Sequence, residues 1–360
     1  MKEGWEYKKL GEVATIINGK NQKAVEDADG IYPICGSGGI MGYANEYLCP
    51  EQTVIIGRKG NINRPIYMEQ KFWNVDTAFG IIADKSQLVP KYLYYFCVDF
   101  NFEKLNKAVT IPSLVKSDLL KIEMSIPPLS EQQQIVEELD LLSSIIEKKK
   151  AQLNELDNLA QSLFYEMFGD PITNEKGWEV KKLGDVCVFL QGEQVPVEEQ
   201  SDIQLEGMVR FLRIIDFTQG NEPPRYVFCK DKKHILDSDE IAIVRYGSPG
   251  YVCYGKYGVI ANNLFKIVAR NKEQFVFRYF VSWLLSDAFQ SVVNGNQYGA
   301  ALKAIKFGTI KDIPFIQPPV ALQQHFASKI EAIEHQKELI KQSIKEVETL
   351  FNSRMDYYFN

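Results

Sequence analysis

The sequence contains one ten-residue stretch twice, as GWEYKKLGEV at residues 4–13 and as GWEVKKLGDV at residues 177–186. Self-similarity of this kind is the signature of internal repetition, and it constrains the fold before any single helix or strand is assigned. The chain of 360 residues is also longer than a usual single domain of roughly 100–200 residues. The repeat therefore predicts two similar globular domains.

Three further matches occur in the same order in both copies. They pair residues 58–60 with 245–247, residues 79–83 with 265–269, and residues 127–133 with 318–324. The offset grows along the chain because the second copy holds extra residues, chiefly around 193–240. Four ordered matches indicate a duplicated unit, in which an α/β globular part is followed by a Pro-Pro break and a long helix.

A hydrophobic pattern with alternating steps of four and three residues follows each Pro-Pro break. In the first copy it comprises Ile135, Leu139, Leu142, Ile146, Lys149, Leu153, Leu156, Ala160, Leu163 and Met167. In the second copy it comprises Phe326, Ile330, Ile333, Lys337, Ile340, Ile344, Val347, Phe351, Arg354 and Tyr358. A 3.5-residue period kept over about five heptads is typical of a coiled-coil seam.

The ends of the first helix follow from its flanking residues. Ser130 with Gln133 predicts a capping-box start, and Gly169 predicts the end. Lys149 and Lys337 interrupt the two seams. We expect their ammonium groups to reach solvent along flexible stems, the alternative being that they set the register of the helices.

Shorter elements are expected inside the globular parts. Apolar runs bounded by Gly, Asn and Pro predict strands at residues 53–57, 211–217 and 241–246. A helix is expected at residues 91–107, with a counterpart at 275–294.

The predicted fold is α/β, of the α+β type, with two similar globular domains separated by two long antiparallel coiled-coil helices in a pseudo-two-fold plan. The predicted parts are residues 1–128 (domain one), 129–169 (helix one), 170–317 (domain two) and 318–360 (helix two). In this plan residues 357–360 end near domain one, just as residues 164–170 lead into domain two. Trp5 and Trp178 are expected to anchor the domains rather than to stack on bases.

Charge is unevenly distributed along the chain. The net charge is −6, and residues 129–176 account for all of it, with 10 acidic and 4 basic residues. The other regions are close to neutral, so either domain can still present basic residues on one face to a polyanion. We expect the acidic segment to stand away from phosphates and to face protein partners.

Composition and cysteine usage are those of an ordinary globular protein, at 45% hydrophobic and 24% charged residues. The six cysteines are scattered without a C-x-x-C pair, and the three histidines form no ligand cluster, so we expect no metal site. The N-terminus resembles no signal peptide, and no window suggests a membrane span. We therefore expect reduced cysteines in a cytoplasmic protein.

Enzyme signatures are incomplete in this sequence. A phosphate-loop-like stretch at residues 250–256 has Tyr257 where Ser or Thr would hold magnesium. Residues 69–71 supply half of a nuclease pattern without its first carboxylate. Residues 221–224 resemble a methyltransferase loop that Glu222 interrupts. We therefore predict no catalytic residues.

The ordered pair of motifs resembles a known family. Residues 4–13 and 177–186, with IPPLSEQQQIV at residues 126–136 opening the first long helix, resemble the specificity subunit of Type I restriction–modification systems. The second copy departs from the pattern, because residues 317–324 lack the Ser-Glu before the glutamines.

That resemblance implies a non-catalytic, DNA-binding subunit that is cytoplasmic in a bacterium or archaeon. Each domain would read one half of a bipartite site in double-stranded DNA, and the helices would fix the gap. It implies as partners two modification subunits, which methylate adenine with S-adenosylmethionine, and restriction subunits, which use ATP and Mg. It implies no cofactor in this chain and no membrane partner.

Candidate DNA-binding residues are polar and basic side chains on loops at matching places in the two copies, where such groups can reach base edges and phosphates. In the first copy they are Arg58, Lys59, Asn61, Asn63, Arg64, Lys107 and Thr110. In the second copy they are Arg245, Tyr246, Ser248, Asn296, Gln297, Lys303 and Lys306. Two other hypotheses stay open, namely a catalytic nuclease or methyltransferase and a pure coiled-coil scaffold.

Overall fold

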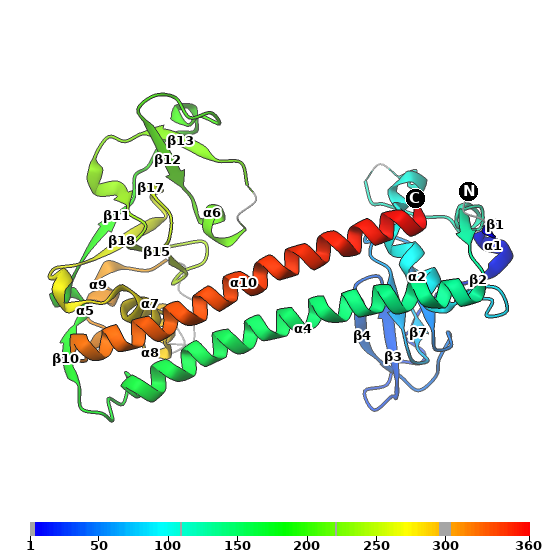
Figure 1. Ribbon diagram of the computed structural model, residues 1–360, viewed down its shortest axis with the longest axis horizontal. Coiled ribbons are helices and arrows are strands. Elements are labelled where there is room, and N and C mark those ends of the chain that lie inside the picture. The colour runs from blue at the N-terminus through cyan, green and yellow to red at the C-terminus, as the bar shows by residue number, and fades with distance from the viewer. Residues whose placement is uncertain (1–3, 109, 220–221, 295–303) are drawn as a thin grey trace. The chain divides into compact units, whose positions relative to one another are not determined.

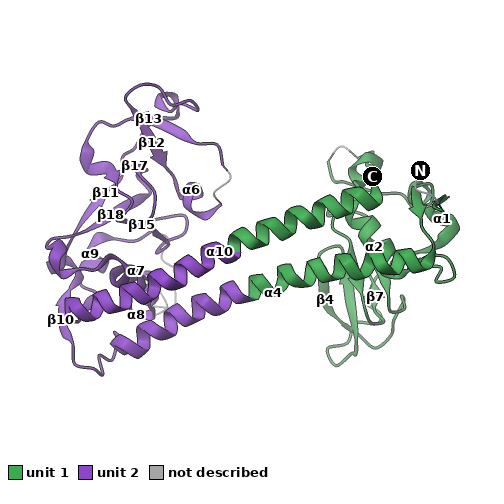
Figure 2. Ribbon diagram, in the orientation of Figure 1, with its two compact units in different colours: residues 1–151, 341–360 green, residues 152–340 purple. Residues whose placement is uncertain are grey.

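The computed structural model describes residues 4–108, 110–219, 222–294 and 304–360. The chain forms two compact units (Figure 2). Unit 1 comprises Met1–Ala151 and Lys341–Asn360, and unit 2 comprises Gln152–Ile340. Each unit therefore holds one globular part and one half of each long helix.

Unit 1 contains two small sheets and a two-stranded ribbon (Figure 1). The ribbon pairs β1 (Glu6–Lys9) with β9 (Glu123–Ile126). The first sheet has the antiparallel order β2 (Ala14–Asn18), β8 (Ala78–Ala83), β5 (Thr53–Gly57) and β6 (Ile66–Met68). The second has the order β4 (Gly39–Ala44), β3 (Tyr32–Gly36) and β7 (Trp73–Asn74), with β3 and β7 parallel.

Unit 2 repeats this topology and adds one strand, β14, to its second sheet. Its ribbon pairs β10 (Glu179–Lys182) with β19 (Pro314–Gln317). Its first sheet has the order β11 (Cys187–Gln191), β18 (Leu264–Ala269), β15 (Ile241–Val244) and β16 (Val252–Cys253). Its second has the order β13 (Arg225–Phe228), β12 (Met208–Leu212), β17 (Gly258–Ile260) and β14 (Ile235–Leu236), in which β12 and β17 are parallel. The duplication seen in the sequence is therefore a duplication of fold.

The helices of the globular parts correspond in part, and unit 2 has more of them. Unit 1 has α1 (Leu10–Val13), α2 (Pro90–Asp99), η1 (Phe102–Leu105) and α3 (Lys116–Leu119). Unit 2 has α5 (Leu183–Val186), η2 (Val197–Glu199), α6 (Ile214–Thr218), η3 (Lys232–His234), η4 (Lys272–Gln274), α7 (Phe277–Leu285), α8 (Asp287–Val293) and α9 (Phe307–Lys311).

Four predicted elements differ from the structure, the simplest case being the strand expected at 241–246, which ends at Val244. The helix expected at 91–107 ends at Asp99, because Asn101 caps a separate 3-10 turn by accepting a hydrogen bond from Glu103 N. The counterpart expected at 275–294 is divided at Ser286, whose backbone is extended. The strand expected at 211–217 ends at Leu212 and is followed by a helical turn. The strand predicted at 53–57 coincides with β5.

The predicted long helices are α4 (Leu129–Phe168) and α10 (Val320–Phe359), each of 40 residues and therefore about 60 Å long. Gly169 ends α4 as predicted. Its φ of +74° is a conformation that favours glycine, and its N–H bonds to Tyr165 O. The start differs from the prediction, since α4 begins one residue before Ser130.

A buried glutamine secures the start of each long helix instead. Gln132 accepts a hydrogen bond from Val89 N and donates to Gln87 O and Pro127 O. Gln323 forms the same three bonds, with Val276 N, Gln274 O and Pro318 O. Both side chains are 0% exposed. The repeated glutamine thus ties the Pro-Pro break to the segment that precedes the domain helix.

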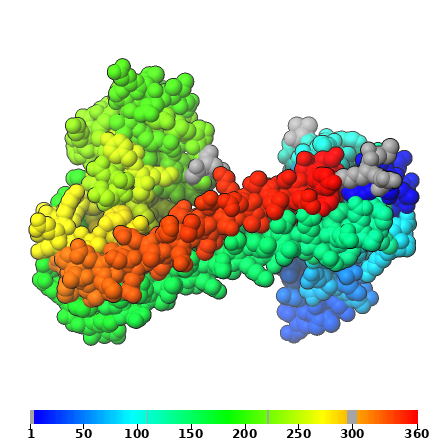
Figure 3. Space-filling model, viewed as in Figure 1, coloured from blue at the N-terminus to red at the C-terminus, as the bar shows by residue number. Residues whose placement is uncertain are grey.

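In unit 1 the two long helices pack antiparallel. Arg354 of α10 binds Glu138 of α4 through two hydrogen bonds, of 2.5 and 2.9 Å, and Tyr358 donates to the same carboxylate at 2.6 Å. Farther along, Lys150 pairs with Glu348 at 3.5 Å. The space-filling view shows this end of α10 lying along α4 (Figure 3).

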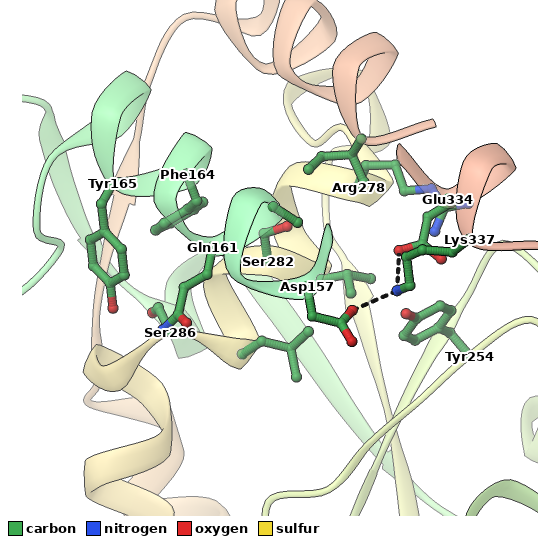
Figure 4. A pocket seen from close by; sticks show the side chains of 14 residues that line it. Asp157, Gln161, Phe164, Tyr165, Tyr254, Arg278, Ser282, Ser286, Glu334 and Lys337 are labelled. Atoms are coloured by element: carbon green, nitrogen blue, oxygen red, sulfur yellow. Dashed lines mark hydrogen bonds and ion pairs between the residues drawn. The ribbon is translucent and has the colours of Figure 1, made fainter. Parts of the chain in front are cut away.

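Lys337 marks the corresponding antiparallel packing in unit 2 (Figure 4). Its ammonium group lies 2.7 Å from Asp157 of α4 and 2.8 Å from Glu334 of α10, and its side chain is only 15% exposed. The expectation that this group reaches solvent was therefore wrong. Lys337 lines a pocket of about 290 Å³ where α7 meets both long helices.

Aromatic residues at the helix ends complete each core. Phe359 of α10 packs on Tyr92 in unit 1, and Phe168 of α4 packs on Tyr279 in unit 2, with ring centroids 5.1 and 4.7 Å apart. The tryptophans of the repeat act as anchors, as predicted. Trp5 Nε1 donates to Glu131, and Trp178 Nε1 donates to Phe168 O.

Candidate nucleic-acid interface

The loop after β5 presents the first group of candidate residues in unit 1. All five residues of β5 are buried, whereas Arg58, Lys59, Asn61 and Arg64 are exposed. The chain turns at Gly60, whose φ of +78° is readily adopted by glycine. Polar side chains on a loop that follows a buried strand are held by a rigid scaffold, which suits recognition.

Two further segments are hydrogen-bonded to this loop. Arg58 N donates to Thr77 O at 2.8 Å, and Arg58 O accepts from Leu114 N at 2.9 Å. Gly60 N also donates to Pro112 O. The segment that carries Lys107 and Thr110 therefore runs beside the 58–64 loop, so the two candidate loops of the first copy form one surface.

Unit 2 repeats the same connections around Arg245. Arg245 N donates to Asn263 O, and Arg245 O accepts from Ile305 N, both at 2.8 Å. The turn again falls on a glycine, Gly247, with a φ of +99°. Lys306 directly follows Ile305 and is exposed. Asn296, Gln297 and Lys303 lie outside the described residues.

Some candidate side chains are held by contacts within the protein. Asn63 Oδ1 accepts from Phe102 N at 2.7 Å, so this residue supports the turn η1. Arg245 lies over the ring of Phe307, and its Nε donates to Ile305 O. Tyr246 donates to Asn262 Oδ1 at 3.1 Å. Contacts within the protein thus fix the orientation of Asn63, Arg245 and Tyr246 before any ligand binds. Ser248 is exposed.

One candidate DNA-binding residue, Lys107, is already paired with a carboxylate of the protein. Lys107 lies 2.6 Å from Asp118, and this hydrogen bond holds the pKa of the Asp118 carboxyl below its usual value. The lysine side chain is nevertheless 76% exposed. Lys107 can exchange this carboxylate for a phosphate at little cost, because ion pairs of exposed side chains are weak.

Sequence reasoning missed the third segment of each surface, at residues 74–77 and 261–263. A glycine follows directly after β2 in unit 1 and after β11 in unit 2, and in each case this segment passes too close for a side chain. A Cβ on Gly19 would lie 1.8 Å from Val75 O, and one on Gly192 would lie 2.2 Å from Ala261 O. These glycines are 173 residues apart, the offset of the opening repeat. Their repetition was the available signal for a close backbone crossing.

Sequence reasoning also missed three cations beside the second surface, namely Arg210, Arg213 and Lys256. They surround Asp216, which lies in the extra residues of the second copy. No repeat motif marks them, and the connection that holds Arg213 and Asp216 is reduced to a two-residue turn in unit 1.

Reactive chemistry is sparse in the described part of the chain. Burial raises the pKa of the Cys35 thiol to about 11 and that of the Cys187 thiol to about 12, so both stay protonated at neutral pH. Among the described residues no group of three His, Cys, Asp or Glu side chains could hold a metal ion. Within the same ranges no helix combines the length and apolarity of a membrane span.

A family model for the type I restriction modification DNA specificity domain matches residues 2–158 and 175–349. The chain belongs to this family. Each of the two matches covers one copy of the repeated fold, including most of its long helix. The specificity-domain family thus accounts for the duplication and for the coiled-coil helices.

Two relatives support the assignment. The specificity subunit of the type I restriction enzyme MjaIX from Methanocaldococcus jannaschii is 25% identical over 322 residues, which cover 79% of this chain and 71% of that protein. The specificity subunit of the type I restriction enzyme EcoDI from Escherichia coli is 26% identical over 158 residues, which cover 43% of this chain and 35% of the relative.

Solved structures show the same fold. The S subunit of a type I restriction–modification system from M. genitalium matches with a TM-score of 0.60 at 14% identity, over 99% of this chain and 96% of that one. A chain from a structure on complex assembly in a type I system matches with a TM-score of 0.59 at 16% identity, over 99% and 97% of the two chains.

Proposed function

We propose that this specificity-family chain is the non-catalytic, DNA-reading subunit of a Type I restriction–modification complex. Each unit reads one half of a bipartite site in double-stranded DNA through its surface at Arg58 or Arg245. The observation that carries the proposal is the repeated loop geometry. The same two backbone hydrogen bonds and the same positive-φ glycine hold loops whose side chains differ, Lys59 and Asn61 in one copy against Tyr246 and Ser248 in the other.

The two loops share their backbone hydrogen bonds but carry different side chains. Such loops would meet DNA in the same way and read two different half-sites. Exposed basic groups such as Arg64 and Lys306 would bind phosphates, while Asn61 and Ser248 can address base edges. The candidates Asn296, Gln297 and Lys303 remain part of the proposed surface of unit 2.

Exchange of residues 1–125 for those of another family member is the direct test of one reader per copy. Adenine methylation would be mapped by single-molecule sequencing in a host that carries this chain with its modification subunits. We expect one half of the methylated motif to change. A change in both halves would contradict the proposal.

The helices α4 and α10 are proposed to set the spacing between the half-sites. Inserting seven residues at the same level in both helices preserves the heptad seam and lengthens the pair by about 10 Å, or roughly 3 base pairs. The complex should then select a longer spacer with unchanged half-sites, or lose activity because the phase along the duplex also changes. Methylation at the original spacing would contradict this role.

Docking of two modification subunits is proposed for the acidic faces of these helices and the adjoining domains. Glu137 and Glu155 are exposed and suited to this role. Glu138 is less suited, because Arg354 and Tyr358 already bind it. S-adenosylmethionine would belong to the modification subunits, and ATP and Mg to the restriction subunits.

The two rival hypotheses predict different results. A catalytic methyltransferase would methylate DNA with S-adenosylmethionine in the absence of partners. A pure coiled-coil scaffold would give a partner complex whose DNA binding is independent of this chain's basic loops. Salt-dependent DNA binding that changes with those loops favours the reader.

A further inference from the structure

The connection between β12 and β13 places one buried carboxylate among three cations, one from this connection, one from β12 and one from the loop between β16 and β17. Asp216 of α6 is 0% exposed at its side chain, and its Oδ1 lies 2.5 Å from Arg210. Its Oδ2 accepts from Arg213 Nε at 3.0 Å and from Arg213 N at 2.8 Å. Lys256 donates to the backbone oxygen of Asp216. We call these four residues the basic cluster.

The basic cluster carries more positive charge than its own carboxylate neutralises. Three cations and one anion leave an excess of two positive charges. Burial alone would raise the pKa of Asp216, but hydrogen bonds from Arg213 and Arg210 bring it below the ordinary value, so the carboxylate is charged at neutral pH. One arginine would suffice to pair with it, and the second is therefore available to an outside anion.

The arginines are both oriented and accessible. Asp216 fixes the two guanidinium groups, and Arg213 is further held by its hydrogen bond to Pro223 O. Their side chains are still 31% exposed for Arg210 and 24% exposed for Arg213. A guanidinium group has five N–H donors, so donors remain after these contacts. Oriented guanidinium groups beside an ammonium group suit a phosphate.

The basic cluster adjoins the loop that we propose to read DNA in unit 2. A Cβ on Gly247 would lie 3.3 Å from Ile214 of α6, and Tyr251 donates to Phe217 O at 3.4 Å. In unit 1 the equivalent connection, between β3 and β4, consists only of Ser37 and Gly38. The longer connection of the second copy thus brings Arg213 and Asp216 beside Arg210 of β12 and Lys256, at the edge of one surface only.

We propose that the basic cluster binds a backbone phosphate of the DNA beside the half-site read by unit 2. The proposal rests on the proposed function, because it takes the 245–250 loop to face DNA. In this proposal the cluster strengthens DNA binding and fixes the position of unit 2 along the duplex, while the loop reads the bases.

The test removes charge while keeping hydrogen-bonding groups. Arg210→Gln and Lys256→Gln would be made singly and together in the full chain, assembled with its modification subunits. Binding would be measured from 50 to 200 mM salt on a duplex with the methylated motif and on one without it. Lys230→Gln is the matched control, because Lys230 lies in the same insertion and pairs with Glu199 in an exposed position.

We expect the slope of log affinity against log salt to fall by about 0.9 for each cation removed. Affinity should drop alike on both duplexes, the methylated motif should not change, and Lys230→Gln should match the unaltered complex. An unchanged slope, or a loss confined to the duplex with the motif, would overturn the proposal. Lys256→Gln lies outside the guanidinium–carboxylate contacts, so it remains informative if Arg210→Gln destabilises the fold.

Variants of the loop separate this proposal from the proposed function. If Ser248→Ala and Tyr246→Phe leave the motif unchanged while the cluster variants lower the salt slope, the reading role of the loop fails and the phosphate site stands. If the loop variants change the motif while the cluster variants bind normally, the phosphate site alone fails.

Discussion

The connection between β3 and β4 in unit 1 and the connection between β12 and β13 in unit 2 join equivalent strands in different ways. The first is a tight turn at Ser37 and Gly38, whereas the second contains α6 and the buried carboxylate of Asp216. The strands on either side keep the same order and direction in both units. The two copies therefore share the arrangement of these strands and differ in the connection beside the proposed DNA-reading loops.

The frame is shared even at the level of single hydrogen bonds. Gln132 and Gln323 make equivalent contacts, and Tyr92 and Tyr279 each donate to a backbone oxygen of the strand before the Pro-Pro break. Such buried groups fix how a domain meets its helix. The comparison thus divides the chain into a repeated scaffold and two distinct surfaces.

The strongest test of the shared scaffold is the buried glutamine. Gln132→Leu leaves Val89 N, Gln87 O and Pro127 O without their partner, and each such group costs about 1–3 kcal/mol. We expect the free energy of unfolding of unit 1 to fall by at least about 3 kcal/mol, with a similar loss in unit 2 for Gln323→Leu. Hydrogen exchange resolved by unit would measure both.

Gln133→Leu is the control, because that side chain is exposed and should cost less than about 0.5 kcal/mol. Two results would contradict an equivalent role for the two glutamines. One is equal stability of the Gln132 and Gln133 variants, and the other is a loss of stability for only one of Gln132→Leu and Gln323→Leu.

A smaller effect is expected from the seam between the long helices in unit 1. Glu138→Lys replaces a bidentate pair with repulsion between Lys and Arg354, at a cost of about 1–3 kcal/mol in thermal or urea unfolding. Glu137→Lys alters an exposed neighbour and should leave the stability within about 0.5 kcal/mol. If both reversals cost the same, Glu138 is not a seam residue.

The same carboxylate predicts a pH effect. The hydrogen bond from Arg354, aided by Tyr358, lowers the pKa of Glu138 below its ordinary value of 4.5. Its contribution is therefore complete above about pH 5 and is lost as the pH falls through the lower folded-state pKa. The stability difference between the unaltered chain and Glu138→Gln should shrink below pH 5 in urea unfolding. A difference that stays constant down to pH 3 would contradict this pairing.

Periodicity and repetition made much of the fold predictable. The two-domain plan and both long helices follow from motifs that occur twice and from seams of ten residues each. The predicted ends of the shorter helices and strands were wrong where local side-chain contacts cap a turn. Asn101 and Asp216 cap turns where a continuous helix and a strand were expected, because a cap depends on a single hydrogen bond that periodicity does not reveal.

Lys337 shows a similar limit. Glu334, three residues before Lys337, was a visible partner, but Asp157 lies 180 residues away in the chain, and only the packing of the two helices brings it to the same ammonium group. For the candidate surface, the repeat located the loops at Arg58 and Arg245, because both follow matching strands. The sequence left the basic cluster unmarked, because its residues come from a strand, an added connection and a distant loop that only the fold brings together.

The most direct test of one surface per half-site is a pair of reciprocal loop variants. Asn61→Ala with Lys59→Ala alters the unit 1 loop, and Ser248→Ala with Tyr246→Phe alters the unit 2 loop. Methylated adenines would be mapped for each variant in cells that also carry the modification subunits.

We expect each variant to relax or change one half of the motif, the two variants to affect opposite halves, and the spacer to stay unchanged in both. A variant that alters both halves, or a pair that alters the same half, would contradict the central claim that each copy of the duplicated fold reads its own part of the DNA.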